Sequence, residues 1–96
     1  MPKYRKKPVV IEAVQYDGNF RCLDIFSLSD VGNFKVGKEE DGSPYLLIPT
    51  LEGNMKCSKW DYVIRGVKGE YYPCKPDIFE ATYDAIEIPT VQNYEK

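Results

Sequence analysis

The first hydrophobic run of this chain, Pro8 to Tyr16, is rich in β-branched residues and ends at the turn signal Asp17-Gly18. Its apolar side chains fall on both faces of an extended chain: Val9, Ile11 and Ala13 on one, Val10, Val14 and Tyr16 on the other. A strand with two apolar faces is typical of a sheet interior. We therefore expect a strand that lies inside a sheet and not at its edge.

A short helix is predicted after this strand. Asn19 can cap it, and the apolar residues Phe20, Leu23 and Phe26 recur at spacing three, with Leu28 near the end. The segment from Ser29 to Pro44 contains three glycines and a charge cluster from Lys38 to Asp41, which favours a loop. Within that loop only Phe34 and Val36 alternate as in a short strand.

Two hairpins are predicted next. The first turns at Glu52-Gly53, which would place Ile48 opposite Cys57 and Thr50 opposite Met55. Its core face would then carry four apolar side chains: Leu46, Ile48, Met55 and Cys57.

The second hairpin pairs residues 62–66 with 70–74 around the loop Val67-Lys68-Gly69, where glycine supplies the left-handed conformation. In this register Ile64 faces Tyr72 and Tyr62 faces Cys74. Arg65 would lie opposite Tyr71 on the other face, which we expect to be exposed.

A last helix opens at Lys75-Pro76-Asp77, since proline is tolerated at the first helical position. Its expected buried stripe consists of Ile78, Phe79, Thr82 and Tyr83. Ala85 to Ile88 could add a terminal strand, and residues 89–96 resemble a frayed tail. Residues 1–88 are therefore expected to form one small α+β domain, in which two hairpins and the N-terminal strand build an antiparallel sheet or a partial barrel with two short helices.

Composition excludes several classes of protein. The 96 residues suffice for one small domain. With 13 basic and 15 acidic residues, the chain has a net charge of −2, which disfavours a nucleic-acid binder. The chain has no histidine, the usual general base and the commonest metal ligand. Its cysteines, Cys22, Cys57 and Cys74, have no metal-binding spacing. We expect no metal, no cofactor and free thiols, in a soluble cytoplasmic protein without signal peptide or membrane span.

Aromatic residues make up 14% of the chain, and some of them gather near charged residues. Trp60, Asp61 and Tyr62, with Arg65 and Tyr71 nearby on the second hairpin and Lys68 in its loop, could form a platform on which a base or peptide stacks. The alternative interpretation is a turn aspartate that caps the backbone beside core aromatics.

Other charged or reactive residues also allow both a functional and a structural interpretation. Four basic residues, Lys56, Lys59, Arg65 and Lys68, could form an electropositive pocket for an anion. The basic N-terminal residues are expected to be solvated, and Cys74 is expected to be a core thiol despite the helix that follows it.

Two blocks, residues 4–16 and 61–83, resemble a family of small phage and prophage proteins named for a Pro-Gly-Asp-Tyr-Gly (PGDYG) signature. The stretch from Leu46 to Gly53 fits as well. At the signature itself this chain has Lys59-Trp60-Asp61-Tyr62-Val63, so only Asp-Tyr is shared and the glycine before it is replaced. The resemblance implies a phage-borne or prophage-borne protein inside a bacterial host cell, and it implies no catalytic residues.

These observations favour a non-enzymatic accessory protein that binds a host protein or sequesters a small ligand. One alternative is a virion or assembly component, in which the tyrosine-rich surface would be a subunit interface of a homo-oligomer. Nucleic-acid binding is a third hypothesis, and an enzyme is the least favoured class.

Overall fold

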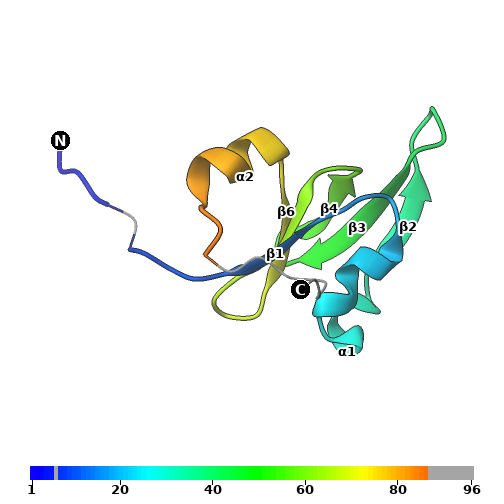
Figure 1. Ribbon diagram of the computed structural model, residues 1–96, viewed down its shortest axis with the longest axis horizontal. Coiled ribbons are helices and arrows are strands. Elements are labelled where there is room, and N and C mark those ends of the chain that lie inside the picture. Colours follow the sequence, from blue (N-terminus) through cyan, green and yellow to red (C-terminus); the bar gives the residue numbers. More distant parts are fainter. Residues whose placement is uncertain (6, 87–96) are drawn as a thin grey trace, which may run out of the picture.

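Two three-stranded antiparallel sheets form the core of the computed structural model, which describes residues 1–5 and 7–86 (Figure 1). One sheet has the order β1-β5-β6 and the other β2-β3-β4. The strands are β1 (Glu12–Gln15), β2 (Lys35–Lys38), β3 (Pro44–Thr50), β4 (Gly53–Ser58), β5 (Tyr62–Arg65) and β6 (Tyr71–Cys74). The helical elements are the 3-10 helix η1 (Phe20–Ile25) and the α-helices α1 (Leu28–Val31) and α2 (Pro76–Thr82). The predicted α+β class is confirmed, but the hairpins belong to different sheets and close no barrel.

A strand forms within the predicted run, but it is shorter than predicted and lies at the edge of its sheet instead of inside it. β1 covers only four residues, pairs with β5 alone and stands at the end of its sheet. Val10 of the predicted run is 70% exposed, whereas Tyr16, just after the strand, is almost fully buried. The apolar residues before Glu12 therefore do not belong to the sheet.

The predicted helix after Asp17-Gly18 exists as a 3-10 helix. The Asn19 side chain accepts a hydrogen bond from the Arg21 amide at 2.9 Å, which confirms the cap. Leu23 and Phe26 are buried, but Leu28 is exposed and begins the separate helix α1. The following segment is more ordered than expected, because α1 and β2 both lie in it. Phe34 is buried and Val36 is exposed.

The first hairpin forms, with a register that differs by two residues from the prediction. Ile48 pairs with Met55 and Leu46 with Cys57, so Leu51 and Glu52 form the turn. A shift of two preserves the face of every side chain. Leu46, Ile48 and Cys57 are accordingly buried as predicted, while Met55 lies nearer the turn and is 39% exposed.

The second hairpin has the predicted register: Tyr62 pairs with Cys74, Ile64 with Tyr72 and Arg65 with Tyr71. Gly69 adopts a φ of +83°, the left-handed conformation that the three-residue loop requires. The expectation that the Arg65–Tyr71 face is exposed was wrong, because Tyr71 is buried. Both faces of this hairpin are covered, each by a different layer.

Helix α2 covers one of these faces and begins at Pro76 as predicted. The Tyr62 and Phe79 rings stack with centroids 3.8 Å apart and planes within 10°. The predicted stripe is only partly right, since Phe79 and Tyr83 are half-buried but Ile78 and Thr82 are exposed. Ala85 and Ile86 form no strand, and the rest of the predicted terminal strand and tail lies outside the described residues.

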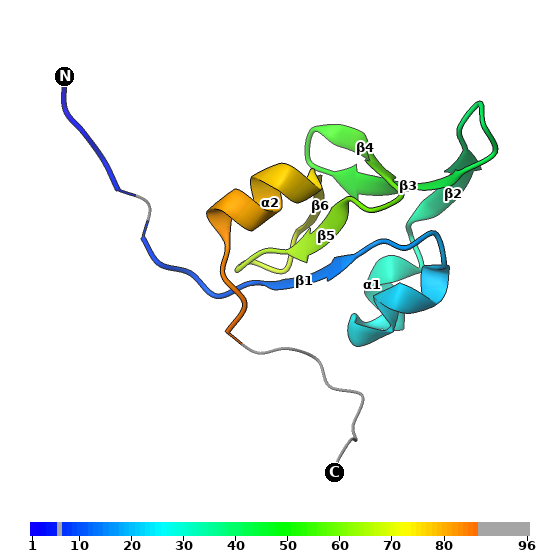
Figure 2. The same cartoon turned by 45° about the horizontal axis from the view of Figure 1, so that its top comes forward.

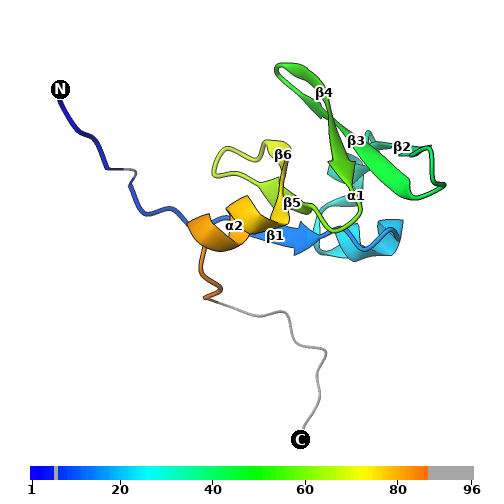
Figure 3. The same cartoon turned by 90° about the horizontal axis from the view of Figure 1, so that it is seen from above.

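The main core lies on the other face of β5 and β6. Figures 2 and 3 show α2 and the β2-β3-β4 sheet at different sides of the β1-β5-β6 sheet. Tyr71 lies at the junction, with its ring edge-on to Phe26 at 5.1 Å and to Phe34 at 5.5 Å. Residues from both sheets and both N-terminal helices join it in one cluster: Tyr16, Leu23, Phe26, Val31, Phe34, Leu46, Ile48, Cys57 and Val63. None of the helices in the described part of the chain is long and apolar enough to span a bilayer.

Candidate functional site

A groove of about 610 Å³ opens where three distant segments of the chain meet. Residues 30–34, after the start of α1, form one side, and the β3–β4 turn with its flanking residues 49–55 forms another. Residues 69–72, at the start of β6, complete it. The packing of the two sheets therefore creates this groove, because each sheet contributes one of its hairpin ends.

The charged side chains that line the groove are acidic, and one cation, Arg65, lies at its edge beside Gly69 and hydrogen-bonds to Tyr71. Among the described residues, the charged side chains that line it are Asp30, Glu52 and Glu70. Asp30 accepts a hydrogen bond from the Tyr71 hydroxyl at 2.9 Å, and Glu70 accepts one from the Lys68 amide at 3.0 Å. The side chain of Glu52 projects from the exposed turn. Three carboxylates in one groove attract cations and repel phosphate groups.

Apolar side chains lie between these carboxylates. Phe34 is buried at the base, Met55 is partly exposed and Leu51 is fully exposed. An exposed leucine at a turn beside an exposed methionine gives a partner an apolar surface to cover. The groove thus combines apolar contact area with negative charge.

The titratable phenols of the groove are poorly suited to acid–base chemistry at neutral pH. Burial, and then the hydrogen bond to Asp30, raise the pKa of Tyr71 above its usual value. Burial, together with a hydrogen bond to Tyr83, raises the pKa of Tyr72 to about 12. Both shifts move the phenols further from the pKa near 7 that suits a general acid or base.

A second, smaller hollow of about 460 Å³ lies at the opposite end of the β3–β4 hairpin, beside Trp60. Trp60 is half exposed, and the Lys59 ammonium lies 5.2 Å from the centre of its ring. Its backbone φ is +80°, a conformation that strains a residue with a side chain. Glycine is the residue that adopts this backbone conformation freely.

Hydrogen bonds hold this turn in place. The Trp60 amide donates to the Tyr16 carbonyl at 2.6 Å, and its carbonyl accepts from the Gln15 side chain at 2.9 Å. Asp61 is buried, and its Oδ2 accepts from the Ser58 amide and from Lys75 Nζ, both at 3.0 Å. These contacts match the alternative interpretation of Asp61 as a capping residue.

Replacing Trp60 should reveal the strain directly. We expect Trp60→Gly to be more stable than Trp60→Ala by about 1 kcal/mol, because alanine retains the left-handed strain that glycine removes. At an ordinary position the order is reversed, since glycine costs more conformational entropy. Urea denaturation of both variants measures the difference, and an alanine variant as stable as the glycine variant would contradict the strained backbone.

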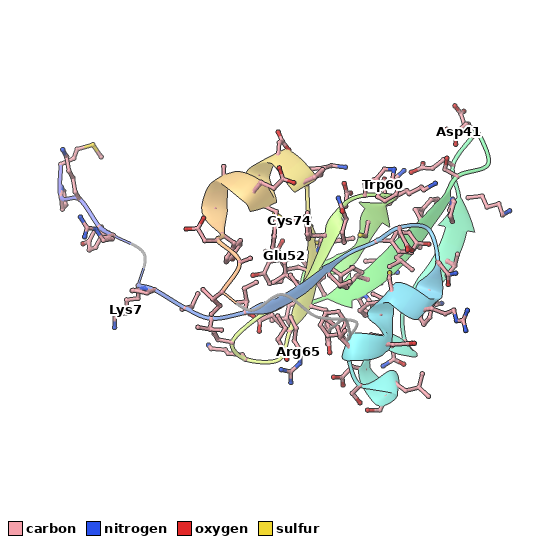
Figure 4. All side chains as sticks on the ribbon, in the orientation of Figure 1. Lys7, Asp41, Glu52, Trp60, Arg65 and Cys74 are labelled. Carbon is pink, nitrogen blue, oxygen red and sulfur yellow. The ribbon has the colours of Figure 1, made fainter. Side chains whose placement is uncertain are left out.

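The structure divides the predicted aromatic platform. Trp60 and Asp61 lie at the turn after β4, Tyr62 is stacked under α2, and Tyr71 lines the groove. Arg65 and Tyr71 remain neighbours, as predicted, and their side chains share a hydrogen bond. The Arg65 guanidinium also contacts Glu12 at 3.3 Å and lies well apart from Trp60 in Figure 4. Lys68 is exposed in the β5–β6 loop and does not line the groove.

The predicted basic pocket is divided too. Lys56 is paired with Glu39 at 2.8 Å and also lies over the Tyr45 ring, while Lys59 lies over Trp60. Arg65 and Lys68 belong to the other sheet and its loop. The four residues therefore form no common electropositive site.

The three thiols are poor nucleophiles at neutral pH. Burial raises the pKa of Cys22 and Cys74, and burial with the nearby Asp61 raises that of Cys57 to about 12. Cys74 is half-buried and its raised pKa fits a packed thiol rather than one activated by the following helix. Within the described ranges, no group of three or more potential ligands is arranged to hold a metal ion.

Sequence reasoning missed the groove except for Tyr71. The sequence around Asp30, Glu52 and Glu70 does not mark them as site residues, because acidic residues are common in turns and at helix starts. They come together only when the two sheets pack.

When the chain was compared with protein-family models, with curated proteins and with solved structures, nothing matched.

Proposed function

We propose that this protein is a non-enzymatic binding module that holds a cationic, partly apolar segment of a partner protein in the groove. The observation that carries the proposal is the lining: its charged side chains in the described part of the chain are all carboxylates, and they lie beside the exposed Leu51 and Met55. Lysine or arginine side chains of a partner would pair with the carboxylates, while its apolar side chains cover Leu51.

A protein segment suits this groove better than a small ligand does. Sites for small molecules bury most of the ligand surface. One side of this groove is formed by the exposed turn residues Leu51 and Glu52, so a small ligand bound there would stay in contact with solvent. Nucleic acid is disfavoured because its phosphates would meet three carboxylates. The raised pKa of Tyr71 and the raised pKa of the thiols support binding rather than catalysis.

The resemblance to phage and prophage proteins supports a bacterial host protein as the partner. A protein made in an infected cell has access to cytoplasmic host proteins. A virion or assembly component is the second candidate, and the exposed apolar and basic N-terminal residues favour it, because such residues suit contacts between subunits.

The first test is binding of a fluorescein-labelled peptide of alternating lysine and leucine, followed by fluorescence anisotropy. We expect Glu52→Gln to weaken binding by about three- to tenfold, because one of three carboxylates loses its charge. Glu52 lies in the exposed turn, so its substitution should leave the fold intact.

Glu80→Gln is the matched control, since it removes the same charge from the exposed surface of α2, away from the groove. This variant should bind the peptide as the wild type does. Equal loss in both variants would indicate only a general charge effect. A peptide that binds neither the wild type nor a variant without the basic N-terminal residues would contradict the proposed function.

A further inference from the structure

Residues 1–5 and 7–10 belong to an arm that leaves the domain. Within its described part every residue is exposed, including Tyr4 at 93% and Val10 at 70%. Figures 1, 2 and 3 all show the chain before β1 extending away from both sheets, and Figure 4 shows Lys7 on this arm. The arm therefore presents apolar and basic side chains that its own domain does not cover.

The charge of the arm is opposite to that of the groove. Lys3, Arg5 and Lys7 alternate along it, so in an extended chain they lie on one side at intervals of about 6.5–7 Å. The positions between them are Tyr4, which offers an aromatic ring, and Lys6, which adds a fourth cation to the segment. The arm thus has the chemistry that the groove attracts: repeated cations with apolar side chains among them.

The arm also leaves the domain beside the groove. Glu12, the first residue of β1, pairs with Arg65, which in turn pairs with Tyr71. These three residues form one row across the sheet, and Tyr71 lines the groove. Only one strand, β5, separates the base of the arm from the groove wall.

We propose that the groove receives the N-terminal arm of a second copy of this chain, and that two copies exchange their arms reciprocally. This inference rests on the proposed function, because it names an occupant of the same groove. Arm exchange would cover the groove in the resting protein, and a basic segment of another protein would have to displace the arm in order to bind.

The composition of the arm favours binding in the groove of a second copy over binding in the groove of the same chain. Residues 1–11 contain no glycine, and Pro2 and Pro8 restrict the backbone at and before each proline. A return into its own groove would require the chain to reverse direction just before Glu12. A stiff, extended arm reaches a neighbouring copy without that reversal.

The test is sedimentation velocity on the full chain at about 100 µM, at about 20 mM and about 500 mM salt. We expect a dimer at low salt that dissociates at high salt. The arm variant Lys3→Ser/Arg5→Ser/Lys7→Ser and the groove variant Glu52→Lys should each be monomeric. A mixture of the two should regain association, because the arm variant keeps an intact groove and the groove variant keeps an intact arm.

Lys35→Ser/Lys38→Ser is the control, since it removes exposed positive charge from β2 and leaves the arm and groove unchanged. This variant should dimerise as the wild type does. A monomeric wild type at low salt would overturn the inference, as would a dimer that persists in the arm variant.

The labelled lysine–leucine peptide separates this inference from the proposed function. We expect the arm variant to bind the peptide at least about threefold more tightly than the wild type, because no arm competes for the groove. Peptide binding that depends on Glu52 in a monomeric wild type would refute arm exchange and leave the proposed function standing. Arm-dependent dimers in which neither wild type nor arm variant binds the peptide would support arm exchange and refute the proposed function.

Discussion

Tyr71→Ala is expected to lower the free energy of unfolding by about 3–5 kcal/mol, the usual range for removing a large buried aromatic side chain. The Tyr71 ring lies between the two sheets and makes edge-on contacts with Phe26 and Phe34. Its hydroxyl donates to Asp30 Oδ2 at 2.9 Å, which links β6 to α1. Truncation would leave a cavity at the junction that holds the sheets and the N-terminal helices together.

Tyr71→Phe separates the two contributions of this side chain. The phenylalanine keeps both ring contacts and loses only the hydrogen bonds of the hydroxyl with Asp30 and Arg65, so we expect a cost of about 1–2 kcal/mol. Urea denaturation monitored by circular dichroism measures both variants. A loss below about 1 kcal/mol for Tyr71→Ala would show that the ring does not join the sheets as described.

Ile64→Ala is expected to cost about 2–4 kcal/mol. Ile64 is 1% exposed and pairs with Ala13 on one side and Tyr72 on the other. It lies on the same face of β5 as Tyr62, the face that α2 covers through the stacked Phe79. The variant therefore tests whether α2 and the β1-β5-β6 sheet enclose a second buried layer.

Val67→Ala is the control for Ile64→Ala, because it removes apolar volume from an exposed position in the neighbouring loop, where Val67 is 64% exposed. Its cost should stay within about 0.5 kcal/mol. A melting temperature that Ile64→Ala leaves unchanged would contradict the burial of this face.

Local chemistry explains which elements were predictable. Asn19 caps η1, Pro76 begins α2, and Gly69 takes the left-handed position of the second hairpin, each through contacts within a few residues. The first hairpin shows how a local signal can be misread. The Thr50 hydroxyl donates to the Gly53 carbonyl and accepts from the Glu52 amide, which moves the turn to Leu51-Glu52.

The position of β1 shows where pattern alone was insufficient. The run from Pro8 to Tyr16 carries apolar side chains on both faces and therefore predicted an interior strand, but only Glu12–Gln15 pair, and with a single neighbour. Apolar side chains on both faces indicate that both faces of a segment can be covered. It does not indicate whether a sheet, a helix or another molecule covers them.

The sequence by itself determined the α+β class, the second hairpin with its register, and the starts of η1 and α2. It also established that the chain has no histidine. The tertiary structure decided the division into two sheets, the burial of Tyr71 and the groove with its three carboxylates. The physical reason is the range of the interactions. Turns and caps depend on residues a few positions apart, whereas the groove joins segments about 20 residues apart, and only the packing of one sheet on the other brings them together.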